Sequence, residues 1–88
     1  MRYRVSWDPD AFRGLRRAWV AANEPESGIR AFDAIEQILI VDAHMQGESR
    51  EGDRRILIVP PLGVIFRARP ETREVLILEA WMIAGRSL

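Results

Sequence analysis

The sequence predicts an α+β fold in a single domain that spans residues 1–88: one strand, two helices and three further strands. Three observations support this prediction. Residues 2–7 alternate between apolar and polar, two stretches of helical periodicity follow, and three short apolar runs near the end of the chain are separated by turn residues. We expect the helices to form a hairpin on one face of a small, mostly antiparallel, four-stranded sheet.

The first strand and first helix meet at Asp8-Pro9. Asp8 is a good N-cap residue and Pro9 suits the first helical position, so the helix begins here. Apolar residues at helical spacing continue it to about Ala22. In the strand before it, the period of two puts Arg2, Arg4 and Ser6 on one face and the following residues on the core face: Tyr3, Val5 and Trp7.

The second helix follows a turn at residues 23–26, and Ser27 is its predicted cap. Residues 42–53 are charged, contain two glycines and are predicted to be irregular. The apolar stripe of the second helix is predicted to be Ile29, Phe32, Ile35, Ile38 and Leu39. The three later strands are predicted at Arg54–Val59, at Leu62 to about Arg69, and at Arg73–Ile83.

Successive side chains of a strand point to opposite faces of the sheet, so the sequence assigns the side chains of the later strands to a core face and an outward face. In the third strand, Val64, Phe66 and Ala68 form the better core set, which leaves Ile65, Arg67 and Arg69 outward. In the fourth strand the predicted core residues are Leu76, Leu78, Ala80 and Met82, and the predicted outward residues are Val75, Ile77, Glu79, Trp81 and Ile83. The outward face would then carry an apolar patch, rimmed by arginine, of Ile65, Ile77, Trp81 and Ile83. Such a patch is typical of a partner surface, either for another protein or for a second copy of this chain.

Arginine supplies all thirteen positive charges, and the net charge is zero. Genomic base composition is the simpler cause of the absence of lysine, but the positions of the arginines carry information. In a meander, the end of the third strand lies beside the starts of the second and fourth. We therefore expect five arginines at one end of the sheet: Arg54, Arg55, Arg67, Arg69 and Arg73. They could hold an RNA backbone, but acidic residues of a partner or of this chain are favoured as their counter-charges.

Several other chemistries find no support in the sequence. There is no cysteine, and His44, the only histidine, is predicted to be an exposed turn residue, so neither a metal site nor a cofactor is expected. A phosphate-binding loop of the GxxxxGK[ST] type is impossible without lysine. No apolar run is long enough to span a membrane, and no signal peptide is recognisable, so a cytoplasmic protein is expected.

The ordered set of four segments resembles the RelE/ParE superfamily of bacterial toxins, which includes plasmid-stabilisation proteins. The segments are YRVSW, AIEQILIVDAHMQGESREG, RRILIVPPLGVIFRA and REVLILEAW, and they extend from Tyr3 to near the end of the chain. The resemblance implies the toxin component of a type II toxin–antitoxin module, neutralised by a cognate antitoxin. RelE-like members cleave mRNA on the ribosome, whereas ParE-like members inhibit DNA gyrase without cutting nucleic acid.

The resemblance also indicates which residues would act. Arg54 or Arg55, together with Arg67, match basic residues of the ribonuclease branch, and Arg86 is a weaker match in the tail. The chain departs from that branch because it has no lysine, because its only tyrosine is Tyr3, and because Gly63 and Val64 stand where a catalytic arginine is expected. A ParE-like inhibitor or a non-catalytic member is therefore predicted, with a ribosome-dependent endoribonuclease and a non-toxic homodimer as alternatives. The predicted binding residues are Arg2, Arg4, Arg54, Arg55, Arg67, Arg69, Arg73, Ile65, Ile77 and Trp81.

Overall fold

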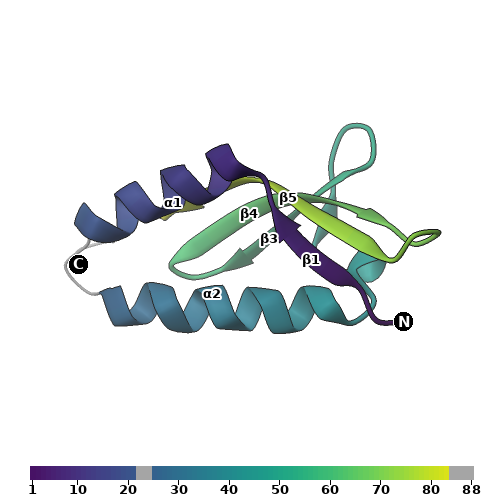
Figure 1. Ribbon diagram of the computed structural model, residues 1–88, viewed down its shortest axis with the longest axis horizontal. Helices are drawn as coiled ribbons and strands as arrows, with labels where there is room; N and C mark the ends of the chain where they lie inside the picture. The colour runs from purple at the N-terminus through teal and green to yellow at the C-terminus, as the bar shows by residue number, and fades with distance from the viewer. Residues whose placement is uncertain (22–24, 84–88) are drawn as a thin grey trace.

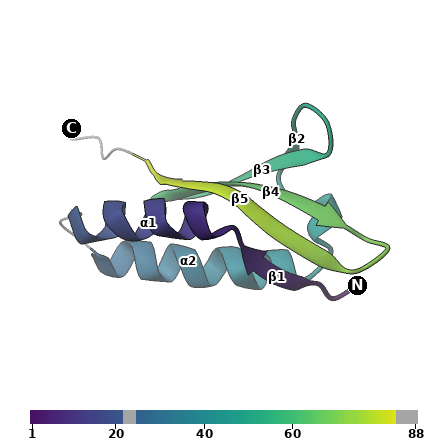
Figure 2. The same cartoon turned by 45° about the horizontal axis from the view of Figure 1, so that its top comes forward.

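The computed structural model describes residues 1–21 and 25–83 and confirms the α+β fold, with helices on one side of a sheet (Figures 1 and 2). Among the described helices, none is long and apolar enough to cross a membrane. Arg86 and the predicted end of the first helix at Ala22 lie outside the described residues. The elements are β1 Arg4–Trp7, α1 Pro9–Ala21, α2 Pro25–Ile40, the 3₁₀ helix η1 Ala43–Met45, β2 Glu48–Ser49, β3 Arg54–Val59, β4 Leu62–Arg69 and β5 Glu74–Met82.

The sheet has five strands, so the predicted count of four was wrong. The additional strand is β2, which pairs antiparallel with the start of β3. Gly47 and Gly52 lie on either side of β2 with φ values of 68° and 71°, a conformation that glycine adopts without steric cost. A strand of two residues is too short to have a readable period, which explains why the sequence indicated only an irregular segment here.

The strand order is β1-β5-β4-β3-β2, and only the β1–β5 pair is parallel. The later strands form the predicted meander, since β4 pairs antiparallel with both β3 and β5. At the end of β1, the backbone N–H of Asp8 donates to the carbonyl oxygen of Ile77 at 2.9 Å. The first strand is thus fixed against the last one immediately before the chain turns into α1.

The start of α1 is as predicted, but the start of α2 is not. The backbone N–H of Asp10 donates to the Asp8 carboxylate at 2.9 Å, so Asp8 caps α1. Helix α2 begins at Pro25 rather than after Ser27, because proline is favourable in the first turn of a helix. The two helices run side by side in opposite directions and cover one face of the sheet (Figures 1 and 2).

The core lies between this helix hairpin and the covered face of the sheet. Helix α2 contributes Ala31, Ile35 and Leu39 at a spacing of four residues, whereas Ile29 is 50% exposed and was wrongly placed in the buried stripe. The largest fully buried side chains come from α1, α2, β4 and β5, and they are Leu15, Ile35, Leu39, Leu62, Val64, Phe66, Val75 and Ile77.

A β-bulge in β5 reverses part of the predicted alternation. Ile65 of β4 pairs with Glu79, but the next residue, Phe66, pairs with Ile77, so Leu78 is an extra residue in β5. An extra residue shifts the alternation of side chains by one position. Before the bulge, Val75 and Ile77 are therefore buried and Leu76 is exposed, which is opposite to the prediction. After it, Ala80 and Met82 pack against the core as predicted.

Candidate functional site

The sheet face that the helices leave uncovered is the candidate functional surface, and we call it the open face. Residues directly opposite each other in neighbouring strands lie on the same face, so the register defines its members. Val64 and Phe66 face the core, which puts the intervening Ile65 and Arg67 on the open face. Their cross-strand partners and the residues in phase with them complete it: Arg4, Ser6, Glu48, Arg54, Ile56, Ile58, Gly63, Arg69, Glu74, Leu76, Glu79 and Trp81.

One half of the open face carries a strip of apolar side chains, flanked by Glu48 opposite Ile56 and by Glu79 opposite Ile65. Ile56 lies opposite Ile65, and Ile58 lies opposite Gly63, which in turn lies opposite Trp81. Ile58 is 46% exposed. We call Ile56, Ile58, Ile65 and Trp81 the apolar strip. It confirms the predicted positions of Ile65 and Trp81, but Ile77 does not belong to it because Ile77 is fully buried in the core.

The indole of Trp81 lies directly over Gly63. A Cβ atom at position 63 would lie 2.5 Å from the Trp81 ring and 3.0 Å from a methyl group of Ile58. The apolar strip can therefore be flat here only because position 63 has no side chain. The residue expected at this place in a RelE-like nuclease is a catalytic arginine, and the structure puts Trp81 over the position instead.

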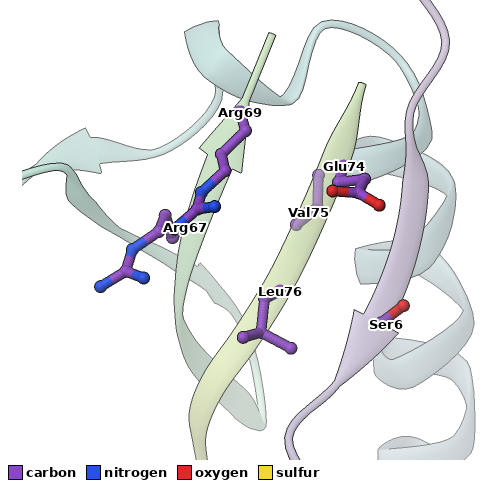
Figure 3. Close-up of a pocket in the computed structure, with 6 residues that line it drawn as sticks. All are labelled: Ser6, Arg67, Arg69, Glu74, Val75 and Leu76. Atoms are coloured by element: carbon purple, nitrogen blue, oxygen red, sulfur yellow. The ribbon is translucent and has the colours of Figure 1, made fainter. Parts of the chain in front are cut away.

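The other half of the open face is polar and holds a hollow of about 250 Å³ (Figure 3). Its walls come from three strands: Ser6 from β1, Arg67 and Arg69 from β4, and Glu74, Val75 and Leu76 from β5. At one side, Arg4 forms an ion pair with Glu74 at 3.2 Å. At the other, Arg67 donates from Nε to the Asp53 carboxylate at 3.1 Å. No ion pair within the described residues involves Arg69.

The structure brings the predicted arginines to one end of the sheet but divides them between its faces. Arg54 lies directly opposite Arg67, and Arg69 lies opposite Glu74, all on the open face. We call Arg54, Arg67 and Arg69 the Arg end. Arg55 points to the covered side because neighbouring residues in a strand alternate.

Two further arginines predicted to bind a partner lie outside the regular strands. Arg73 occupies the turn before β5 with a φ of 57°. Arg2 precedes β1 and forms an isolated backbone bridge with Val41. Both side chains are exposed, and no ion pair involves either of them among the described residues. Neither residue belongs to a regular strand, so the register of the sheet does not assign either side chain to the open face.

The prediction that His44 is an exposed turn residue was wrong. His44 is half-buried in η1, and its Nδ1 lies 2.6 Å from the hydroxyl oxygen of Tyr3. Burial raises the pKa of the Tyr3 phenol, a hydrogen bond with the His44 backbone opposes this effect, and the charges of Asp42 and Glu71 add to it. The alternation of the first strand indicated that Tyr3 is buried, but no local pattern could pair it with a residue 41 positions away.

No group of histidine, cysteine, aspartate or glutamate side chains in the described part of the chain could hold a metal ion. The described open face also carries no histidine or tyrosine. Its chemistry is that of an apolar strip beside guanidinium groups, which suits binding to a partner with apolar and acidic side chains.

Comparison with known proteins supports the fold. A toxin–antitoxin complex, RelBE2 from Mycobacterium tuberculosis, contains a chain with a TM-score of 0.70 and 17% identity, over 97% of this chain and 95% of that one. A chain of the chromosomal ParDE toxin–antitoxin system from P. aeruginosa has a TM-score of 0.66 and 22% identity, over 94% of this chain and 98% of that one. No family model matches the sequence, and no curated protein matches it. The chain therefore shares the fold of these two solved chains along almost its whole length.

Proposed function

We propose that this chain is the toxin component of a type II toxin–antitoxin module, and that its open face binds the cognate antitoxin. The observation that carries the proposal is the continuous surface formed by the apolar strip and the Arg end. Both solved structures named above come from toxin–antitoxin systems, which supports the same class of function for this fold.

The composition of the open face indicates the chemistry of the antitoxin segment. Apolar side chains would cover Ile58, Ile65 and Trp81, and acidic side chains would meet Arg54 and Arg69, which have no ion pair among the described residues. Arg69 lines the hollow of Figure 3, so a carboxylate that enters the hollow could accept hydrogen bonds from its guanidinium group. A short acidic segment with interspersed apolar residues, ordered on binding, fits this surface.

We expect toxicity to come from binding to a cellular target such as DNA gyrase rather than from RNA cleavage. General acid–base catalysis needs a group that exchanges protons near neutral pH. The only histidine and the only tyrosine lie on the covered side of the sheet, away from the Arg end of the open face.

A ribosome-dependent endoribonuclease is the second candidate function. One observation favours it: Arg54 and Arg67, two of the predicted catalytic arginines, lie directly opposite each other on the open face. Two neighbouring guanidinium groups could stabilise the charge of a phosphate during its transfer. Mapped cuts in mRNA after induction, lost in an Arg67→Ala variant, would establish this function.

The first test is growth after tightly controlled expression of this chain in a bacterium, with and without co-expression of any small acidic protein that an adjacent gene encodes. Arrest that the neighbour relieves is expected. Binding is then measured by calorimetry with Trp81→Ala and Arg69→Glu, which should weaken the complex by more than tenfold, as hot-spot residues do. Matched controls on α2, Ile29→Ala and Arg30→Glu, should bind normally because both residues are exposed on the helix side.

The opposite pattern would overturn the proposal. If the α2 variants lost binding while the open-face variants kept it, the antitoxin would bind the helices. A stable homodimer that buries Trp81, with normal growth on expression, would indicate a non-toxic protein that uses the open face for self-association.

A further inference from the structure

A second hollow, of about 310 Å³, lies at the Arg end but on the covered side of the sheet. Helix η1, the β2–β3 hairpin and the start of β3 surround it, and the residues that matter for its chemistry are His44, Ser49, Asp53, Arg54 and Arg55. Of these residues, only Arg54 also belongs to the proposed antitoxin surface.

Arg55 gives the hollow a fixed positive charge. Its guanidinium donates to the carbonyl oxygens of Gln46 and Gly47, at 2.6 and 3.1 Å, and to the hydroxyl oxygen of Ser49 at 3.1 Å. All three acceptors are neutral, and no carboxylate forms an ion pair with Arg55 among the described residues. A half-buried cation whose orientation is fixed but whose charge is not compensated attracts an anion.

His44 directs a second donor group toward the same space. The Tyr3 hydroxyl lies 2.6 Å from Nδ1 of His44, and in the tautomer that leaves Nδ1 unprotonated this hydroxyl donates to it. The neutral imidazole then carries its hydrogen on Nε2, which has no hydrogen-bond partner among the described residues. In this tautomer, Nε2 is the nitrogen of His44 that can donate to a ligand.

Two further groups complete the lining. The Ser49 hydroxyl accepts from Arg55, which leaves its own hydrogen free to donate. Arg54 borders the hollow and has no ion pair within the described part of the chain. The one carboxylate in the lining, Asp53, already accepts from Arg67, which compensates its negative charge.

We propose that this hollow binds a phosphate group, held by Arg55, Ser49, His44 and Arg54. Donors that surround the space from three chain segments suit a tetrahedral oxyanion, whereas the two oxygens of a carboxylate can be satisfied by one guanidinium fork alone. Arg55, Ser49 and His44 lie on the side of the sheet opposite the open face, whereas Arg54 belongs both to this lining and to the proposed antitoxin surface. The phosphate could belong to a free nucleotide or to a nucleic-acid backbone, since the same donors recognise both.

The test is an NMR titration of the full chain with inorganic phosphate at constant ionic strength. We expect saturable shifts of the His44 imidazole and Arg55 Nε–H signals. Titration with a nucleoside monophosphate and with a dinucleoside phosphate then separates the two sources: stronger binding of the first indicates a terminal phosphate, and stronger binding of the second indicates a backbone phosphate.

Variants locate the site and control for nonspecific charge effects. Arg54→Ala and Ser49→Ala change exposed residues and should each weaken phosphate binding by about tenfold, as expected for loss of a hydrogen bond to a charged group. Arg69→Ala, which removes the same charge from the open face, should leave it unchanged. Absence of a saturable shift, an equal response to acetate or a glutamate-rich peptide, or equal weakening by Arg69→Ala would overturn the proposal.

Discussion

The Trp81 indole lies over Gly63 of the neighbouring strand, so the two residues together form the centre of the apolar strip. In Gly63→Ala, the new methyl group would overlap the ring at 2.5 Å and displace it. We expect a loss of about 1–3 kcal/mol in the free energy of unfolding, the usual cost of overpacking.

Urea unfolding of Gly63→Ala checks this expectation, with Gly14→Ala as the matched control. Gly14 lies in α1 and a Cβ there would meet nothing within 4 Å. The control should therefore gain about 0.5–1 kcal/mol, since alanine is the better helix former. If both variants unfolded at the same urea concentration, the contact between Trp81 and Gly63 would not constrain the sheet.

The bulge at Leu78 determines which of two neighbouring residues, Leu76 and Ile77, is buried, so we expect their replacement by alanine to have different effects on stability. Ile77 is fully buried, so Ile77→Ala should lower the free energy of unfolding by about 2–5 kcal/mol. Leu76 is 36% exposed on the open face, and Leu76→Ala should cost less than about 1 kcal/mol. Thermal or urea unfolding of the pair distinguishes this arrangement from unbroken alternation, which would reverse the order of the two losses.

Tyr3 should make the protein sensitive to alkali. Its pKa is raised above 10.0 in the folded state, mainly by burial, so the folded chain holds the phenolic proton more tightly than the unfolded chain. This contribution to stability is fully present below pH 10.0 and is lost as the pH rises through the higher folded pKa. In Tyr3→Phe, the part of the alkaline destabilisation that is due to this group should disappear.

The measurement for Tyr3 is urea unfolding at a series of pH values from neutral to strongly alkaline. At neutral pH, Tyr3→Phe should already be less stable by about 1–2 kcal/mol, because a half-buried nitrogen of His44 loses its partner. If the free energy of unfolding fell equally steeply with rising pH in Tyr3→Phe and in the unaltered chain, groups other than Tyr3 would cause the loss.

We expect the ionised carboxylate of Asp42 to stabilise the folded protein, and this contribution to be lost in acid. Its carboxylate accepts from the N-terminal amino group at 2.8 Å, and this contact lowers its pKa below 3.8. A lowered folded pKa stabilises the protein above pH 3.8, and this contribution is lost as the pH falls through the folded value. Asp42→Asn removes that dependence, and asparagine tolerates the φ of 53° at this position.

Acid unfolding monitored by circular dichroism compares Asp42→Asn with the unaltered chain. Asp10→Asn is the control, because Asp10 pairs with Arg13 on an exposed turn of α1 and does not bridge distant segments. We expect a shallower loss of stability as the pH falls below 3.8 only in Asp42→Asn, whereas identical curves would show that the N-terminal contact has no effect on folding.

The strands and helices whose residues follow a clear period could be predicted from the sequence. The bounds of β3 and β4 agree with the prediction, and Asp8 caps α1 as its chemistry indicates. The gathering of Arg54, Arg67 and Arg69 at one end also follows, because an antiparallel meander of known strands fixes which ends are neighbours.

The remaining features depend on contacts between distant segments, which a local pattern does not encode. The bulge at Leu78, the burial of Ile77, the partnership of Tyr3 with His44 and the packing of Trp81 on Gly63 are all of this kind. The sequence by itself determined the α+β class, the order of the two helices and the four longer strands, and the arginine-rich end, because periodicity and turn chemistry act locally. Only the tertiary structure decided which side chains form the open face and the second hollow, because one extra residue in β5 shifts the alternation on one side of the bulge and because the hollow joins residues from η1, β2 and β3.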